Sequence, residues 1–289
     1  MSKKVAVVTG ANRGIGLGIV RTLCSQFDGD VFLTARDEVK GRAAVEELER
    51  EGLKPKFHPL DISDHSSIKQ LRDFLLKNYG GLDVLVNNAG IALKEDTSLS
   101  FAERVEKTVQ VNYFDNLACS NILMPILRSN ARVCNISSMA SSMAVQQCSP
   151  EIVARLTKPD LEIEELSAIM NQFIQAAKDD TFLQQGFPQD SYGFPKIGLT
   201  VMTAIHQWEL DKQGREDILV NACTPGYVST DMTKHRGGLS VAEGVVTPMY
   251  CITLPAGTTS PRGQMLRDKV PVDWVNFKIE MPSWYKEEK

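Results

Sequence analysis

The sequence has no apolar run long enough to cross a membrane, since the run near its start extends only from Val5 to Val8. A membrane span needs about 20 apolar residues, and a secretory leader needs an apolar segment of about 7–15. We therefore expect no membrane association, no export and a cytoplasmic location. A strong excess of charge is missing too, because 32 Lys and Arg residues stand against 36 Asp and Glu residues. This balance argues against nucleic-acid binding and favours small-molecule chemistry.

Clustered metal ligands are also missing from the sequence. The six cysteines are widely spaced without a C-x-x-C pair, and the four histidines show no spacing typical of metal ligands. These spacings argue against a zinc knuckle and against a disulfide framework. We expect free thiols in a reducing compartment and no metal site.

Short runs rich in Val, Ile and Leu alternate with amphipathic segments. This alternation is typical of a parallel sheet with helices on both faces, because each parallel connection needs a crossover. The predicted fold class is α/β, a doubly wound parallel sheet of Rossmann type, in a single domain over residues 1–274. The expected strands are residues 5–10, 30–36, 56–62, 82–90, 131–138 and 217–226, and the expected helices are residues 16–26, 38–51, 66–78 and 102–124.

Residues 145–188 carry helix signals but no strand signal. Ser149 followed by Pro150 predicts the start of one helix. A later apolar stripe at three- and four-residue steps predicts a helix with one buried face. The stripe consists of Ile163, Leu166, Met170, Phe173, Ile174 and Ala177. We therefore predict an all-helical insertion at about residues 145–188.

A C-terminal extension follows the domain at residues 275–289. Phe277, Ile279 and Met281 alternate as in a half-buried strand, and Trp284 and Tyr285 are suited to packing on the domain. A frayed end is equally compatible with this composition.

The stretch TGANRGIG follows the first expected strand and opens the first expected helix. Gly10, Gly14 and Gly16 allow a tight turn and a close approach of the backbone to a pyrophosphate, which the helix N-terminus attracts. The second expected strand ends at Arg36, and Arg13 lies within the glycine turn. Two guanidiniums suit the 2′-phosphate of NADP(H), although Asp37 leaves the 2′-hydroxyl of NAD as an alternative.

Three further motifs accompany the glycine turn: NNAG at 87–90, NISS at 135–138 and Tyr192-x-x-x-Lys196. With them the sequence resembles the short-chain dehydrogenase/reductases over residues 5 to about 274. Within that family it is similar to the monomeric NADPH-dependent carbonyl reductases, which include 20β-hydroxysteroid dehydrogenases. The resemblance implies the catalytic set Asn112, Ser138, Tyr192 and Lys196. It implies NADPH/NADP⁺ binding by Gly10, Asn12, Arg13, Gly14, Ile15, Gly16, Arg36, Asp61, Ile62, Asn88, Tyr192, Lys196, Val228 and Thr230.

Tyr192 is the expected proton donor for reduction of a carbonyl group. A free tyrosine has a pKa of about 10, and a nearby ammonium group would lower that pKa. Lys196 lies one helical turn further on, on the same helix face. The resemblance implies that Ser138 binds the substrate carbonyl, that Lys196 contacts the nicotinamide ribose, and that Asn112 holds a water that links Lys196 to solvent.

Pro195 lies between Tyr192 and Lys196, where the family usually has a small residue. Proline is tolerated in the first turn of a helix, so we expect the helix to begin around residues 192–194 with Ser191 near its cap. Proline also disfavours the α region for Phe194. A slightly displaced first turn is expected, and a splayed Tyr192–Lys196 pair would lower catalysis strongly.

Several apolar residues are expected to face the substrate: Met139, Met143, Tyr227 and Met232, with Ile91 and Ala92. Methionine adapts to different shapes, which favours varied carbonyl substrates: quinones, aromatic aldehydes and ketones, and also ketosteroids or prostaglandins. The methionines are equally compatible with core packing, and Tyr227 stands where the subgroup often has tryptophan. The subgroup also implies a monomer, because the insertion would cover the helices through which other family members associate.

Three alternative functions are less well supported by the sequence than carbonyl reduction. An enoyl-thioester reductase would space its tyrosine and lysine more widely than Tyr192 and Lys196. An NADPH-binding regulator with little turnover would need Pro195 to disable the pair. An interaction scaffold would need a free apolar face on the helical insertion.

Overall fold

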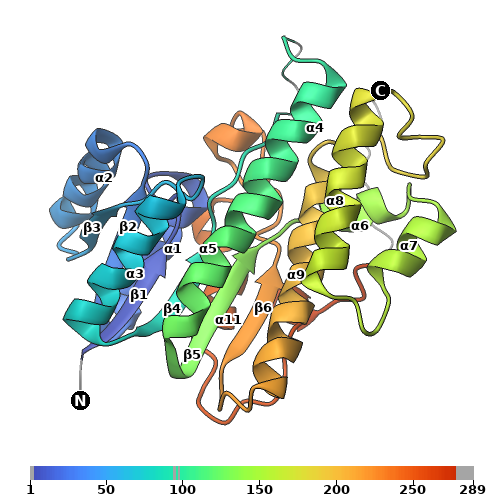
Figure 1. Cartoon of the computed structure of the whole chain (residues 1–289). Coiled ribbons are helices and arrows are strands. Elements are labelled where there is room, and N and C mark those ends of the chain that lie inside the picture. The colour runs from blue at the N-terminus through green and yellow to red at the C-terminus, as the bar shows by residue number, and fades with distance from the viewer. Residues whose placement is uncertain (1–2, 94–95, 97, 278–289) are drawn as a thin grey trace.

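The computed structural model describes residues 3–93, 96 and 98–277 of the 289-residue chain. A sheet of eight strands runs through the domain, with helices on both faces (Figure 1). Its strand order is β3-β2-β1-β4-β5-β6-β7-β8, and only β8 is antiparallel to its neighbour. The predicted doubly wound α/β fold is confirmed.

The strands and helices have the following bounds. The strands are β1 Lys4–Val8, β2 Gly29–Ala35, β3 Lys56–Pro59, β4 Leu82–Asn87, β5 Leu127–Ile136, β6 Leu219–Cys223, β7 Met265–Arg267 and β8 Val270–Pro271. The α-helices are α1 Gly14–Gln26, α2 Glu38–Arg50, α3 His65–Tyr79, α4 Phe101–Val109, α5 Asn116–Leu123, α6 Ala140–Val145, α7 Pro150–Leu156, α8 Ile163–Lys178, α9 Gly193–Lys212, α10 Val241–Gly244 and α11 Val246–Ile252. A π-helix, η1, spans Gln110–Asp115, and two 3₁₀ turns, η2 and η3, span Met124–Ile126 and Asp231–Thr233.

The first strand shows why this sequence folds into three layers. Val5 and Val7 belong to an apolar cluster with α3 and α5, whereas Ala6 and Val8 belong to a second cluster with α1, α2 and α11. Successive side chains of a strand point to opposite faces, so a continuous apolar run is buried only when helices cover both faces. The order in which the strands are added to the sheet reverses at β1, because β2 and β3 lie on one side of it and β4 to β7 on the other. A crevice between the carboxyl ends of β1 and β4 is where such sheets bind nucleotides.

The predicted helical insertion at about residues 145–188 contains α7 and α8, and α6 ends where it begins. The Ser149 hydroxyl accepts a hydrogen bond from the Ile152 amide and caps α7, whose first residue is Pro150, as predicted. Helix α8 buries most of its predicted stripe, although Ile163 and Ile174 are only partly buried. It packs against α4 and α9 (Figure 1). Its apolar face is therefore used inside the domain and is not free for a scaffold.

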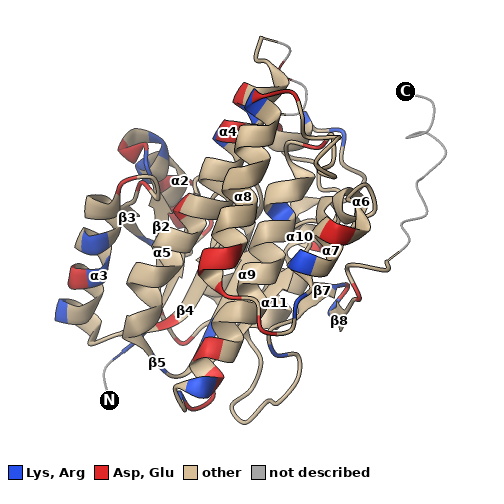
Figure 2. Ribbon diagram, turned by 45° about the vertical axis from the view of Figure 1, so that its right-hand side comes forward, with Lys and Arg blue, Asp and Glu red and all other residues tan. Residues whose placement is uncertain are grey.

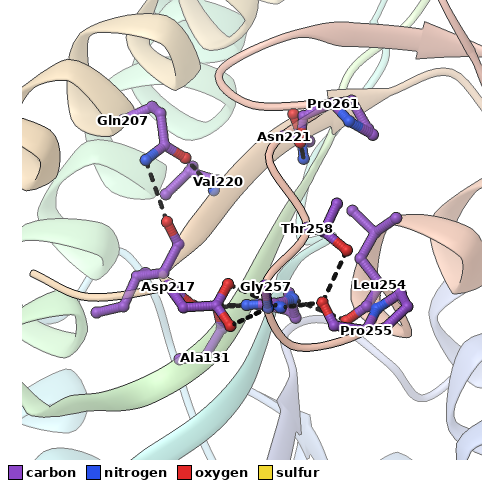
Figure 3. A network of polar contacts seen from close by, with 12 residues as sticks. Ala131, Gln207, Asp217, Val220, Asn221, Leu254, Pro255, Gly257, Thr258 and Pro261 are labelled. Atoms are coloured by element: carbon purple, nitrogen blue, oxygen red, sulfur yellow. Dashed lines mark hydrogen bonds and ion pairs between the residues drawn. The ribbon is translucent and has the colours of Figure 1, made fainter.

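Strands β7 and β8, which were not predicted, extend the sheet beyond β6, and a buried arginine holds the loop that leads to β7. Arg132, on β5, is 3% exposed and donates to the carbonyl oxygens of Leu254 and Pro255. It also donates to the main chain of Asp217 and forms an ion pair with that residue's carboxylate at 3.1 Å. Figure 3 shows how these contacts join the loop before β7 to the start of β6. The guanidinium is tolerated in the interior because its donors find partners there.

The helices that can be seen in Figure 2 carry basic and acidic residues side by side. This mixture agrees with the small net charge of −4. Among the helices described here, none is both long enough and apolar enough to span a membrane. The alternating residues Ile279 and Met281, and Trp284 and Tyr285, lie outside the described residues.

Candidate active site

The glycine turn between β1 and α1 has the shape that the sequence predicts. Gly10 and Gly14 adopt positive φ angles of 60° and 57°, which disfavour any residue with a side chain. A Cβ atom on Gly16 would lie 2.5 Å from the Asn88 amide nitrogen, and one on Gly10 would lie 2.9 Å from the Cα atom of Ala89. The glycines therefore let the turn pack closely against the segment after β4, with the N-terminus of α1 beside it, an arrangement that suits a pyrophosphate.

The NNAG segment after β4 holds this turn in place. Asn88 donates from its side-chain amide to the carbonyl oxygens of Thr9 and Gly10, at 2.9 and 3.0 Å. The Thr9 hydroxyl accepts from the backbone amides of Asn88 and Ala89, both at 3.0 Å. Asn88 thus shapes the glycine turn, and its contact with a cofactor stays a prediction.

The loop at 224–232 covers the glycine turn from the other side. A Cβ atom on Gly14 would lie 3.5 Å from the Thr230 methyl group. Arg13 pairs with the Asp231 carboxylate at 3.0 Å, and both side chains are exposed. Val228, a residue of this loop, is buried, and a Cβ atom on Gly244 would lie 2.5 Å from a Val228 methyl group and 2.8 Å from a methyl group of Ile15. Ile15, Val228 and Thr230 therefore lie near the glycine turn, and their contact with a cofactor stays a prediction. Arg13 has a protein carboxylate as its partner.

Arg36 and Asp37, just after β2, differ in what they contact. Arg36 is exposed and makes no ion pair or hydrogen bond within residues 3–93, 96 and 98–277. Asp37 caps α2, because its carboxylate accepts a hydrogen bond from the Lys40 amide at 3.0 Å. This contact, with the Lys40 side chain nearby, lowers the pKa of Asp37. The acidic residue that left NAD as an alternative is therefore engaged by its own helix.

The remaining predicted cofactor residues are Asn12, Asp61 and Ile62, and they follow the carboxyl ends of β1 and β3. Asn12 is partly buried within the glycine turn. Asp61 follows β3, where its carboxylate accepts from the Ser63 amide, and Ile62 beside it is buried. Their places agree with a nucleotide-binding edge, and their contacts with a cofactor stay predictions.

Tyr192 and Ser138 meet just beyond the carboxyl end of β5. Ser138 follows β5, and its hydroxyl is hydrogen-bonded to the phenol of Tyr192, the residue that precedes α9. Burial raises the pKa of Tyr192 to about 12, an effect that the Ser138 contact opposes and the nearby Asp190 carboxylate reinforces. The phenol therefore keeps its proton at neutral pH, as a proton donor must.

Lys196 lies below the tyrosine ring, with its ammonium nitrogen 5.8 Å from the ring centroid. The side chain is 5% exposed and donates to the Ile136 carbonyl oxygen at 2.6 Å. Burial lowers the pKa of Lys196 to about 8. One helical turn thus holds a phenol and a cation together, as their spacing predicts.

Asn112 lies on the π-helix η1, a local irregularity that often marks functional sites. Its side-chain oxygen accepts from the Ile91 amide at 2.8 Å, and its nitrogen donates to the Ile91 carbonyl at 2.9 Å. A Cβ atom on Gly90 would lie 3.0 Å from the Asn112 oxygen and 3.8 Å from the Lys196 nitrogen. Asn112 is therefore placed to position the segment after β4 beside Lys196, and its predicted contact with a water stays a prediction.

Pro195 is the third residue of α9, within the turn where helix amides have no helical partner. The carbonyl that its missing amide would have reached, that of Ser191, accepts a hydrogen bond from the Thr108 hydroxyl instead. The helix begins at Gly193, within the predicted range, and Ser191 lies next to its N-cap residue, Tyr192. One expectation was wrong, because Phe194 is helical. The first turn is capped by the Asp190 carboxylate, which accepts from the amides of Tyr192 and Gly193 at 3.0 and 2.7 Å. The Tyr192–Lys196 pair is not splayed.

Replacing Pro195 by serine should therefore change turnover by less than about threefold. The proline removes no helical hydrogen bond, and Thr108 already satisfies the carbonyl that it leaves open. Steady-state kinetics of Pro195→Ser beside the unaltered protein measure this. A gain of tenfold or more, at unchanged folded content, would show that the proline impairs the pair.

Asp190 and Thr108 are the site residues that sequence reasoning missed. The signal for Asp190 was present, since an aspartate just ahead of a helix often accepts hydrogen bonds from its first amides. Thr108 is 83 residues from Ser191 along the chain, so only the fold brings the two together.

The predicted substrate residues differ in their exposure to solvent. Tyr227 and Met232 are 43% and 52% exposed, and Met139 and Met143 are partly buried. Ile91 is partly buried and Ala92 is exposed. A cavity of about 320 Å³ between α7, α9 and Trp274 is lined by none of these residues. Their contact with a substrate stays a prediction.

The sheet, the glycine turn and the Ser138–Tyr192–Lys196 cluster define a dinucleotide-binding α/β protein equipped for proton transfer. The family model for short chain dehydrogenases matches residues 4–150. The chain belongs to the short-chain dehydrogenase/reductase family.

Proteins of known name are similar to this chain over almost its whole length. Carbonyl reductase (NADPH) 3 of Rattus norvegicus is 46% identical, over 94% of this chain and 98% of the rat protein. Carbonyl reductase (NADPH) 1 of the same organism is 47% identical, over 94% and 99%. The structure of salutaridine reductase from Papaver somniferum is similar with a TM-score of 0.82 and 25% identity, covering 91% of this chain and 99% of that one.

Proposed function

We propose that this protein is an NADPH-dependent carbonyl reductase, which converts aldehydes, ketones or quinones to alcohols. The observation that carries the proposal is the cluster at the crevice: the Tyr192 phenol is hydrogen-bonded to Ser138, and the Lys196 ammonium lies below its ring. The names of the two rat relatives, at 46% and 47% identity, support the same reaction and cofactor.

Each residue of the cluster would serve one part of the reaction. NADPH, bound along the glycine turn, would supply the hydride for the carbonyl carbon. Ser138 would donate a hydrogen bond to the carbonyl oxygen, and Tyr192, which is hydrogen-bonded to Ser138, would give that oxygen a proton as negative charge grows on it. Lys196 would stabilise the phenolate that remains, since an opposite charge lowers the pKa of a phenol. Asn112, bonded to Ile91, would keep the segment beside Lys196 in position.

The preference for NADPH over NADH would come from Arg36. Its guanidinium is exposed beside β2, and the neighbouring Asp37 carboxylate is engaged by α2. A guanidinium binds a phosphate through charge-assisted hydrogen bonds, each of which contributes about 1.5–3 kcal/mol.

Replacing Arg36 by alanine should raise the KM for NADPH by about 10- to 100-fold and leave the KM for NADH nearly unchanged. The increase in KM is confined to NADPH because only this cofactor carries the 2′-phosphate that Arg36 would bind. Initial rates with both cofactors measure it, and Arg42→Ala, a change at another exposed arginine, is the matched control. An equal loss with both cofactors would show that Arg36 has only a structural role.

The proposed substrates are quinones, aromatic aldehydes and ketones, with ketosteroids or prostaglandins as larger members of the range. The partly buried Met139 and the exposed Tyr227 and Met232 are candidates for the substrate surface, and methionine adapts to different shapes. Oxidation of NADPH in the presence of each substrate class tests the function. Tight binding of NADPH without turnover of any carbonyl would instead support the regulator with little turnover.

We infer that the protein is a monomer, because α8 packs over α4 and α9 and uses its apolar face there. The expected mass in sedimentation equilibrium at micromolar protein is 32.0 kDa. A mass of twice that value would contradict the inference. A cytoplasmic location is also proposed, since the six cysteines are free thiols and disulfides persist mainly in oxidising compartments.

A further inference from the structure

Three cysteines that are far apart in the sequence meet in the interior. Cys134 lies on β5, Cys223 on β6 and Cys251 on α11, and their side-chain sulfur atoms all lie within 4.8 Å of one another. The sulfur atoms of Cys134 and Cys223 are 3.5 Å apart. All three residues are at most 1% exposed. The reaction proposed above uses none of these thiols.

The arrangement is poorly suited to a disulfide bond. A disulfide brings two sulfur atoms to about 2.05 Å and needs Cα atoms no more than about 7 Å apart. Cys134 is level with Asn221 in the sheet and Cys223 is level with Ile136, so the two cysteines are diagonal neighbours on adjacent strands. Such neighbours are about 7–8 Å apart. A bond between two of the sulfurs would also leave the third without a role.

One ion at the centre of the three sulfurs fits the observed spacing. A metal–thiolate bond is about 2.3 Å long, and three such bonds in a plane place the sulfurs about 4.0 Å apart. A pyramidal arrangement brings them closer. In the structure, two of the sulfurs are 3.5 Å apart and no two are more than 4.8 Å apart, so the planar value of about 4.0 Å lies within the observed range. The cluster thus has the spacing of a three-coordinate site for a thiophilic ion.

The apolar surroundings of the three cysteines favour an ion whose complex with three thiolates is neutral. The three cysteines belong to an apolar cluster that includes Val86, Ile136 and Met249. The ammonium group of Lys196 interacts with Cys223 but is hydrogen-bonded to the Ile136 carbonyl. A zinc ion with three thiolates would carry one negative charge, whereas a trivalent ion would be neutral. Burial disfavours the charged complex.

We propose that Cys134, Cys223 and Cys251 form a binding site for trivalent arsenic. Arsenous acid, As(OH)₃, would react with the three thiols to form three As–S bonds and release three molecules of water. Each thiol proton leaves with one hydroxide of the acid, and arsenic stays trivalent, so no oxidant or reductant is needed. The site would join β5, β6 and α11 in one neutral complex.

Access to the site sets the rate of binding. No thiol of the cluster is open to solvent, so the ion must enter when α11 separates locally from the sheet. We therefore expect slow binding that stabilises the folded protein, because an ion bound only to the native state raises the unfolding temperature.

The test uses the full-length reduced protein with sodium arsenite. Native mass spectrometry should show the gain of one arsenic atom and the loss of three hydrogens. X-ray absorption at the arsenic edge should show three sulfur neighbours. Single variants Cys134→Ala, Cys223→Ala and Cys251→Ala should each weaken binding by about 10²-fold or more, because one of three linked ligands is lost.

Cys119→Ala is the matched control, since Cys119 is also fully buried but lies outside the cluster. It should bind arsenite as the unaltered protein does. The unfolding temperature of each variant without arsenite shows whether it folds, and a double variant, Cys24→Ala with Cys148→Ala, removes the two partly exposed thiols without touching the cluster. Arsenic with fewer than three sulfur neighbours, binding lost in the double variant, or equally tight binding of Zn²⁺ would overturn the proposal.

Discussion

Tyr192→Phe should lower the rate of carbonyl reduction by about 10²- to 10⁴-fold, the range typical of a lost general acid. In the proposed reaction the phenol is the proton donor, and burial raises its pKa to about 12, so that it stays protonated until reduction begins. Phenylalanine keeps the ring that lies above Lys196 and removes only the hydroxyl. Binding of NADPH should therefore change little.

Two measurements check this result. Turnover at saturating NADPH measures the chemical step, and fluorescence titration with NADPH measures cofactor binding. Tyr113→Phe is a suitable control, because Tyr113 is also buried and hydrogen-bonded, to Ser167, away from the crevice. A Tyr192→Phe variant that keeps more than about a tenth of the activity would show that another group donates the proton.

Lys196→Met should have the second largest effect, a loss of about 10²- to 10³-fold in kcat, comparable to removal of one charge-stabilising donor. Methionine is similar in length but lacks the ammonium group, so the phenolate that forms on Tyr192 would lose its opposite charge. Because the Lys196 ammonium also donates to the Ile136 carbonyl, the variant leaves that buried oxygen without this partner. Some loss of stability is expected as well.

The pH profile separates the role of the charge from a structural role. Burial lowers the pKa of Lys196 to about 8, so the ammonium is present below that pH and is lost as the pH rises through it. For the unaltered protein, kcat/KM for the carbonyl should therefore fall above a pH of about 8. Lys196→Met should lack this fall. An identical decline in the variant would assign the titration to another group.

The fold could be predicted from the sequence because several local signals agree. The buried runs at Val5 to Val8 and at the later strands, together with the glycines at the turn, indicate a parallel sheet with helices on both faces. Strands β7 and β8 span three and two residues, too few for any periodicity to show. The π-helix at Asn112 was predicted as part of one continuous helix, because its apolar pattern continues on both sides.

Local spacing could predict only those parts of the candidate site that are close in the sequence, whereas Asn112 and Ser138 came from the family resemblance. Tyr192 and Lys196 lie within one helical turn, and the glycine turn is one short motif. The pairing of Arg13 with Asp231 and the support of the Ser191 carbonyl by Thr108 join residues from distant segments. The three-cysteine cluster could not be predicted from the spacing of cysteines either, because 89 residues separate Cys134 from Cys223.

The most direct test of the proposed function uses NADPH that carries deuterium on the transferable position of the nicotinamide. An aromatic aldehyde is incubated with the protein and this cofactor, and the alcohol is examined by mass spectrometry. The account predicts one deuterium on the carbinol carbon of the product from the unaltered protein and almost no product from Tyr192→Phe. Bound NADPH with no deuterated alcohol, from a range of aldehydes and ketones, would contradict it.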